Sequence, residues 1–213
     1  METKIIPAIL AQDFDEFKEM VKLTENDFEL LQIDAIDGQF VDNVTFYDVS
    51  RLNEIKTTAK FELHLMVNNP LETIRQIDDS RITRVIFHIE PVKNQIKEII
   101  TEIKNKGLKI GLALNPGTPL SEVEPFLNEI DMVLLMTVNP GWSGQGFLES
   151  SYEKIRELRK ISQNIEIEVD GGVSPENIYR LIKAGVNSLA IGSALFKAKD
   201  IQSTIENLKE IVK

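Results

Sequence analysis

The sequence predicts a (β/α)8 barrel, in which eight parallel strands close into a cylinder and the helices form an outer ring. Apolar runs of four to eight residues alternate with longer amphipathic stretches along the 213 residues, giving eight strand-then-helix units. Strict alternation of this kind indicates parallel strands joined by helical crossovers. A doubly wound sheet is the alternative, but the chain has no Gly-x-Gly-x-x-Gly after its first apolar run and no low-complexity linker. We therefore expect residues 1–213 to form one barrel domain.

The expected strands are short runs rich in Ile, Leu, Val and Phe. Runs of this length, bounded by polar or glycine residues, are typical of strands buried in a parallel sheet. They are expected at residues 4–10, 28–34, 61–67, 83–90, 108–115, 131–138, 165–170 and 187–192.

Each strand is followed by an expected helical stretch, and several of these stretches carry start or stop signals. Seven of them are closed ranges or turns: 13–26, 93–106, 118–128, 148–161, 174–185, a short turn after 192, and 200–212. Of the other two, one ends at about residue 59 and one begins at residue 70. Pro70 and Pro175 suit a first helical position. Thr118 and Ser174 are expected caps, and Gly185 is an expected stop signal.

The composition excludes several classes of partner. The formal net charge is −10 and the pI is about 4.8, whereas nucleic acids and anionic membranes select Lys and Arg, so neither partner is expected. There is no cysteine, which excludes disulfides and cysteine nucleophiles. The chain opens without a signal-peptide pattern, and no apolar run approaches the roughly 20 residues of a membrane helix, so we expect a cytoplasmic location.

Polar residues gather where the expected strands end, which is where chemistry lies in a (β/α)8 barrel. The strand-end residues are Asp34, Asp37, His64, Met66, His88, Glu90, Asn115, Met136, Asn139, Asp170, Gly171, Gly172, Gly192 and Ser193. Asp34 and Asp170 have no basic residue in their own strands, and a buried carboxylate without a partner is unfavourable. Two carboxylates across a barrel mouth suit acid–base chemistry at one carbon, because one can remove a proton and the other can return one.

Some strand-end residues have structural interpretations that stay open at this point. Asp37 precedes Gly38 and fits a turn former. A lone strand histidine is commonly structural, which suits His88, whereas His64 shares its rim with two carboxylates. The methionines Met66 and Met136 are expected to serve packing.

Three glycine-rich segments follow the last three expected strands. They are NPGWSGQGF at 139–147, DGGVSPEN at 170–177 and GSALF at 192–196. Loops after the seventh and eighth strands form the common phosphate site of such barrels, because glycine lets backbone N–H groups approach phosphate oxygens. Plain turn chemistry is the alternative for any one of them. Trp142, in the first segment, would either cover a substrate or pack.

Five segments together resemble the ribulose-phosphate 3-epimerase family. They are IDAIDGQFVDN at 33–43, HLMV at 64–67, LALNPGTPL at 112–120, LLMTVNPGWSGQGF at 134–147 and VDGGV at 169–173. The resemblance runs from IIPAIL at 5–10 to AIGSALF at 190–196, nearly the whole chain. It implies a barrel of the ribulose-phosphate-binding type and an isomerase that inverts C3 of a ketose phosphate. The default reaction of the pentose phosphate route interconverts D-ribulose 5-phosphate and D-xylulose 5-phosphate.

The resemblance also implies roles for individual residues. Asp34 and Asp170 would be the catalytic pair serving the two faces of C3 through an enediolate, and with His64 they would hold a divalent metal. The implied phosphate-binding residues are Gly144, Gly171, Gly172, Gly192 and Ser193. The implied substrate pocket contains Ala8, Gln32, His64, Met66, His88, Met136 and Trp142. Family members are dimers or hexamers, which implies a homo-oligomer.

Two departures from the family pattern fall at the polar end of this pocket. Gln32 stands where the family has a metal-binding histidine, and Ala8 stands where it has a serine. An amide oxygen is a far poorer zinc ligand than imidazole, so a site with Zn, Mn, Fe or Mg and a site without metal both stay open. Without a metal, hydrogen bonds from Gln32 and His64 would have to stabilise the enediolate. No organic cofactor is expected.

Three other functions stay open beside the default reaction. The first is epimerisation of another pentulose or hexulose phosphate, since both departures change the polar end of the pocket. The second is an aldolase or decarboxylase reaction on the same scaffold, although no strand-end lysine offers a Schiff base. The third is sugar-phosphate binding without catalysis.

Overall fold

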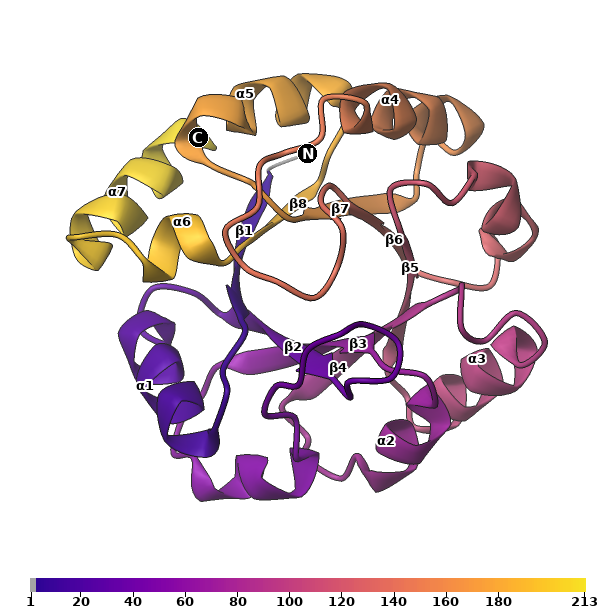
Figure 1. Ribbon diagram of the computed structural model, residues 1–213, viewed down its shortest axis with the longest axis horizontal. Helices are drawn as coiled ribbons and strands as arrows, with labels where there is room; N and C mark the ends of the chain where they lie inside the picture. Colours follow the sequence, from indigo (N-terminus) through magenta and orange to yellow (C-terminus); the bar gives the residue numbers. More distant parts are fainter. Residues whose placement is uncertain (1–2) are drawn as a thin grey trace.

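Eight parallel strands close into a barrel in the computed structural model, which describes residues 3–213 (Figure 1). The strands are β1 (Lys4–Ile9), β2 (Leu30–Ile36), β3 (Lys60–Met66), β4 (Ile82–His88), β5 (Lys109–Leu114), β6 (Met132–Met136), β7 (Glu166–Asp170) and β8 (Ser188–Ile191). Each strand pairs with the next along the chain, and β8 pairs with β1 to close the cylinder. The predicted (β/α)8 barrel is confirmed, and the doubly wound sheet is excluded.

The helices form a ring outside the strands (Figure 1). They are α1 (Phe14–Thr24), α2 (Pro70–Gln76), α3 (Ile96–Asn105), α4 (Ser151–Ile161), α5 (Pro175–Ala184), α6 (Ser193–Phe196) and α7 (Ile201–Ile211). Asp13 caps α1 by accepting hydrogen bonds from two backbone N–H groups of its first turn. As expected, α5 follows Ser174 and ends at Gly185, whose φ of 112° is the left-handed conformation that stops a helix.

The expected helix after β2 is only a short 3-10 helix, η1 (Val49–Glu54). The guanidinium of Arg81 donates to the carbonyl oxygens of Leu52 and Ile55 at 2.6 and 2.7 Å. Arg81 thus satisfies carbonyl oxygens at the end of η1, where the backbone of Ile55 is already extended, with a φ of −98° and a ψ of 122°.

The stretch 118–128 also lacks an α-helix and forms two 3-10 helices, η2 (Leu120–Glu122) and η3 (Glu124–Phe126). Pro125 has no N–H for an α-helical hydrogen bond, which explains the break. The expected cap Thr118 serves another purpose, because its hydroxyl donates to Glu90 Oε1 at 2.6 Å. Two further helices begin later than expected, α3 at Ile96 and α4 at Ser151.

The barrel carries two separate apolar cores. The larger one lies between the strands and the helix ring and includes Leu31, Leu63 and Phe87. The smaller one lies on neighbouring strands β4 to β6 and contains Ile86, Ala113, Met132, Leu134, Met136 and Val138. Inward-facing positions of β2, β3 and β7, together with Arg84 and His88 on β4, carry polar side chains, so the interior has an apolar side and a polar side that meet at β4.

Two loops are linked at the mouth of the barrel. The segment between β6 and α4, salmon to orange in Figure 1, crosses the barrel opening in that view. Gln145 folds this segment by donating from Nε2 to the carbonyls of Asn139 and Trp142 at 2.6 and 2.9 Å. Asn43, from the loop after β2, donates to the Gly141 carbonyl at 2.7 Å and joins the two loops.

The helices of residues 3–213 are short, and the longest have 11 residues. None of them combines the length and the apolar character that crossing a membrane requires.

Candidate active site

The barrel brings Asp34, His64 and Asp170 together at its carboxyl end. Asp34 on β2 is directly paired in register with His64 on β3. Asp170 is the last residue of β7 and reaches the same point from across the cylinder. His64 Nδ1 lies 3.0 Å from Asp34 Oδ1 and 3.3 Å from Asp170 Oδ2, so one ring nitrogen faces both carboxylates.

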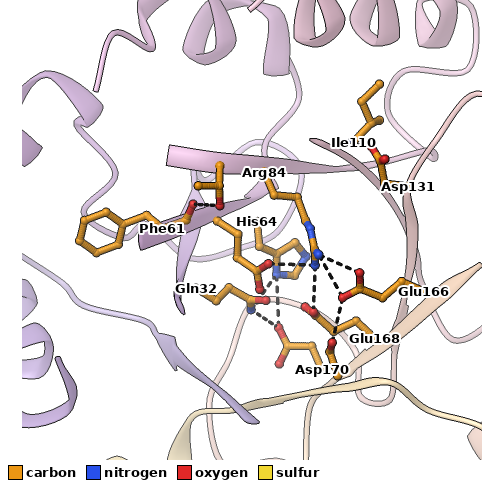
Figure 2. A network of polar contacts seen from close by, with 12 residues as sticks. Gln32, Phe61, His64, Arg84, Ile110, Asp131, Glu166, Glu168 and Asp170 are labelled. Atoms are coloured by element: carbon orange, nitrogen blue, oxygen red, sulfur yellow. Dashed lines mark hydrogen bonds and ion pairs between the residues drawn. The ribbon is translucent and has the colours of Figure 1, made fainter. Parts of the chain in front are cut away.

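Gln32 lies between the carboxylates of Asp34 and Asp170, and Figure 2 shows its contact with Asp170. Its Nε2 donates to Asp34 Oδ1 at 2.8 Å and to Asp170 Oδ2 at 2.7 Å. The same nitrogen lies 3.5 Å from His64 Nδ1. Its Oε1 is buried and has no hydrogen-bond partner among the described residues. One amide group therefore bridges two acids that would otherwise repel each other.

The electrostatics of the cluster favour a charged imidazole. Burial opposes the imidazolium, but hydrogen bonds from His64 to Asp170 and Asp34, together with their negative charges, raise the pKa of His64 to about 9. Burial and the negative charge of Asp170 raise the pKa of Asp34, against the hydrogen bonds from His64 and Gln32. The cluster of His64, Asp34 and Asp170 is thus suited to share a proton among its side chains.

His88 continues the polar chain away from the carboxylates. Its Nε2 lies 3.0 Å from His64 Nε2, and its Nδ1 lies 3.2 Å from Glu90 Oε2. Burial lowers the pKa of His88, although the contact with Glu90 opposes this. A neutral His88 with its proton on Nδ1 then accepts from the charged His64 and donates to Glu90, which satisfies every contact.

Glu90 is fixed in turn by the loop that follows β5. Its Oε1 accepts from the Asn115 N–H at 2.7 Å and from the Thr118 hydroxyl. Burial would raise the pKa of Glu90, but hydrogen bonds from His88, Thr118 and the Asn115 backbone outweigh it and hold that pKa at about 2. Glu90 therefore stays ionised and orients His88.

A buried charge cluster lies one inward position below the site. Arg84 on β4 donates from Nη2 to both carboxylate oxygens of Glu166 at 3.0 and 2.9 Å. Its Nη1 lies 3.1 Å from Glu62 Oε2 and 3.5 Å from Glu168 Oε2 (Figure 2). Glu62 and Glu168 immediately precede His64 and Asp170 on the inner faces of β3 and β7.

A cavity of about 390 Å³ opens in front of the two carboxylates. Its lining includes most of the residues expected at the pocket and the phosphate site, namely Ala8, Asp34, Met66, Met136, Trp142, Gly144, Asp170, Gly171, Gly172, Gly192 and Ser193. Gln32 and His64 are fully buried, and His88 is 1% exposed, so these three lie behind the lining rather than in it. Asp34 and Asp170 retain 6% and 8% exposure and are the members of this polar cluster that line the cavity.

Trp142 and Asp37 differ clearly in their surroundings. Trp142 lines the cavity and is 61% exposed, so the indole is not packed into the core. The carboxylate of Asp37 accepts hydrogen bonds from the N–H groups of Gln39, Phe40 and Asn68. This arrangement is a turn, as the sequence suggested for Asp37.

The glycines around the cavity have conformations and contacts that exclude side chains. Gly171 has a φ of 111°, and a Cβ there would lie 2.3 Å from Val138 Cγ2. Gly172 has a φ of 63°, and a Cβ there would lie 2.7 Å from the Phe147 nitrogen. Their backbones face the loop after β6 so closely that only glycine fits.

Asp34, His64 and Asp170 also satisfy the basic requirement of a metal site. Ligating atoms of Asp34, His64 and Asp170 all lie within 4.8 Å of one another. Two carboxylates and one imidazole are an ordinary donor set for a divalent ion.

Several residues near the site were not found from the sequence. Arg84, Glu62 and Glu168 form the charge cluster, and strand alternation would have placed all three on inner faces beside His88, His64 and Asp170. Lys197, which also lines the cavity, is the first cation after GSALF. A search for the first positively charged residue after the glycine-containing segment GSALF would have found Lys197.

Acid–base side chains beneath glycine-rich loops at the mouth of a (β/α)8 barrel are typical of barrel enzymes that act on phosphorylated substrates. The chain belongs to the ribulose-phosphate 3-epimerase family, whose family model matches residues 4–196. This membership confirms the predicted resemblance and the prediction of an isomerase class acting on carbohydrate phosphates.

Named relatives from distant organisms support the assignment. The chloroplastic ribulose-5-phosphate-3-epimerase of Arabidopsis thaliana is 39% identical over 213 residues, covering 96% of this chain and 75% of the relative. The ribulose-phosphate 3-epimerase of Schizosaccharomyces pombe is 36% identical over 217 residues, covering 100% and 95%.

Solved structures share the fold at low sequence identity. The 3-hexulose-6-phosphate synthase of Salmonella typhimurium aligns with a TM-score of 0.74 at 14% identity, covering 100% of this chain and 98% of that one. A tryptophan synthase alpha-subunit of Pyrococcus furiosus aligns with a TM-score of 0.72 at 17% identity, covering 100% and 99%. These likenesses show the fold alone.

Proposed function

We propose that this protein interconverts D-ribulose 5-phosphate and D-xylulose 5-phosphate by moving a proton at C3. The observation that carries the proposal is the pair Asp34 and Asp170, which reach one cavity from opposite sides of the barrel and share the Gln32 amide. Inversion at a carbon needs a base on one face and an acid on the other. The family to which the chain belongs supplies the substrate class.

In the mechanism we propose, one aspartate removes the C3 proton and the other aspartic acid delivers a proton to the opposite face. The intermediate is an enediolate, and the two residues exchange roles in the reverse reaction. The raised pKa of Asp34 favours a protonated acid at one side of C3. Within the polar cluster, the reacting carbon meets the two carboxylates, because Gln32 and His64 lie behind them.

Gln32 and His64 act on the carboxylates rather than on the substrate. The Gln32 amide holds one oxygen of each acid, and the His64 imidazolium offsets their negative charge. Fixed hydrogen bonds of this kind orient catalytic groups before the reaction begins and so avoid reorganisation during it.

The three-residue donor set fits a divalent metal, and Gln32 determines which kind. Asp34, His64 and Asp170 would be the ligands, and turning the Gln32 amide about its last bond would present the partnerless Oε1 as a fourth. Two carboxylates, an amide oxygen and one imidazole suit Mn²⁺ or Mg²⁺ better than Zn²⁺. When bound, such an ion would supply positive charge beside the enediolate.

The phosphate is proposed to lie against the glycines on the other side of the cavity. Gly144, Gly171, Gly172, Gly192 and Ser193 line that side. Their close backbones leave N–H groups as the natural donors to phosphate oxygens.

Proton exchange in D2O tests the function. NMR of D-ribulose 5-phosphate with the purified protein should show deuterium at C3 and the appearance of D-xylulose 5-phosphate. Running the reaction with chelator and with added Mn²⁺ separates a metal-free reaction from a metal-dependent one. The absence of exchange under both conditions would refute this substrate assignment.

A second ketose phosphate is the competing substrate, and Ala8 favours it. Ala8 lines the cavity on β1 and offers no hydroxyl to a sugar. A pocket that lacks such a group discriminates less among sugar hydroxyls. Comparison of kcat/KM for D-ribulose 5-phosphate and for hexulose 6-phosphates decides between them.

We also propose a homo-oligomer in the cytoplasm. The family resemblance supports a dimer or hexamer, and one relative is named a cytoplasmic isoform, from Oryza sativa. Analytical ultracentrifugation of the purified protein would contradict the oligomer if it gave only the 24.1 kDa species.

A further inference from the structure

We propose that Lys197 supplies the positive charge that holds the substrate phosphate over the glycine loops. This inference rests on the proposed function and adds a residue that discriminates phosphorylated from unphosphorylated sugars. Lys197 directly follows α6, and its backbone N–H donates to the Ser193 carbonyl at 3.1 Å. The lysine is therefore anchored to the loop that carries Gly192 and Ser193.

The side chain of Lys197 spans from the β8 loop to the β6 loop. Its Nζ lies 3.4 Å from the position that a Cβ on Gly144 would occupy. Gly144, Gly172, Ser193 and Lys197 all line the same cavity. The ammonium group thus lies beside backbone that the proposed function assigns to the phosphate.

Lys197 has no competing partner in the described part of the chain. Within residues 3–213, no hydrogen bond or ion pair involves its Nζ. Other cations of the neighbouring helix–loop layer are engaged, since Arg180 pairs with Glu149 at 2.7 Å and Lys154 donates to the Asn115 carbonyl at 2.8 Å. The Lys197 charge is available to a ligand.

The charge balance of the cavity favours such a group. Among the described residues that line the cavity, four carry carboxylates, namely Glu16, Glu19, Asp34 and Asp170. Lys197 is the cation among them. In a chain with a net charge of −10, a phosphate dianion would otherwise meet mainly repulsion. Backbone N–H groups orient a phosphate through directional hydrogen bonds. A lysine adds a full positive charge that attracts the anion at a distance.

Kinetics on Lys197→Ala and Lys197→Arg test the inference. We expect Lys197→Ala to raise KM for the sugar phosphate about tenfold, as loss of one charge-assisted hydrogen bond does, with kcat nearly unchanged. Lys197→Arg should retain most of the affinity. Lys199→Ala is the matched control, because Lys199 is exposed two residues away and does not line the cavity. The KM of wild type should rise with salt more steeply than that of Lys197→Ala.

Inhibition by inorganic phosphate separates this inference from the proposed function. Lys197→Ala should weaken the inhibition constant of phosphate by a similar factor, and Lys199→Ala should not. An active wild type with unchanged KM and unchanged phosphate inhibition in Lys197→Ala would overturn the role of Lys197 alone. If wild type turns over no ketose phosphate, calorimetric titration with phosphate still decides: equal affinity of wild type and Lys197→Ala overturns the role, and weaker binding by the variant supports it.

Discussion

Gln32 Nε2 on β2 lies 2.7 Å from Asp170 Oδ2 on β7, a contact across the barrel between residues 138 positions apart in the chain. The same nitrogen is 2.8 Å from Asp34, so the amide fixes the separation of the two acids. Carboxylates held this close affect each other's ionisation, and the group between them therefore controls how the site shares its proton.

Removing either acid should abolish most of the activity. We expect Asp34→Asn and Asp170→Asn each to lower kcat by about three orders of magnitude, because each deletes the proton transfer at one face of C3. Asp37→Asn is the matched control, since Asp37 bonds three backbone N–H groups instead of lining the cavity. It should keep kcat and lose about 1–2 kcal/mol of unfolding free energy. Equal losses of kcat in all three variants would contradict the assignment.

Replacing Gln32 with histidine should strengthen metal binding. Imidazole is the better ligand for Zn²⁺, and Gln32→His would remove an amide that now donates to Asp34 and Asp170. We expect the affinity for Zn²⁺ to rise by at least about tenfold, measured by equilibrium dialysis with metal analysis. Gln39→His adds an exposed histidine elsewhere and should leave metal binding unchanged. Equal affinity of wild type and Gln32→His would show that residue 32 does not face the ion.

The charge cluster below the site should make stability depend on pH. Burial, opposed by the positive charge of Arg84, raises the pKa of Glu62 to about 7 from an ordinary value of 4.5. Between these values the folded protein binds more protons than the unfolded chain, so the free energy of unfolding falls as pH rises from 4.5 through about 7. The loss should be about 3 kcal/mol, since each pKa unit corresponds to about 1.4 kcal/mol.

Urea denaturation of Glu62→Gln checks this dependence. The variant cannot ionise at residue 62, so its unfolding free energy should fall less than that of wild type across the same pH range. Glu98→Gln, at an exposed residue, should behave like wild type. A variant that follows the wild-type curve would assign the pH dependence to other groups.

A cavity glycine and a glycine outside the cavity should differ sharply in their tolerance of a methyl group. Gly171→Ala would place a Cβ 2.3 Å from Val138 at a φ of 111°, and we expect a loss of about 3 kcal/mol or more. Gly117→Ala meets no atom within 4 Å and should be nearly neutral. Thermal unfolding of both variants measures the difference, and similar melting temperatures would refute the close approach at Gly171.

The barrel and the meeting of Asp34, His64 and Asp170 at its mouth were predictable because they depend on local patterns. Strand alternation placed Asp34 and His64 on inner faces, and the ends of β2, β3 and β7 meet once a barrel closes. The helix expected over 118–128 was wrong, although Pro125 argued against it. The contacts of Arg81 with the carbonyls at the end of η1 could not be predicted, because Arg81 comes from a later part of the chain.

Contacts across the cylinder were the harder part. Alternation shows that Arg84 and Glu166 face inward, but not that they meet, because strand stagger and side-chain length decide which inward groups touch. The same applies to Gln32, whose place between the acids depends on β7 lying opposite β2. Lys197 falls after the last motif, and only the folded loops bring its ammonium to Gly144.

The division of the barrel interior separates two tasks that protein engineers usually have to balance. The apolar cluster on β4 to β6, which includes Ile86, Leu134 and Met136, has no part in the hydrogen bonds among Gln32, His64 and the acids. Met136 and Val138 of this cluster line the cavity, so a mutant library confined to these two residues can reshape the cavity for larger or smaller sugars without replacing an acid–base group. Such a library would turn one catalytic arrangement into a panel of enzymes with different substrate ranges.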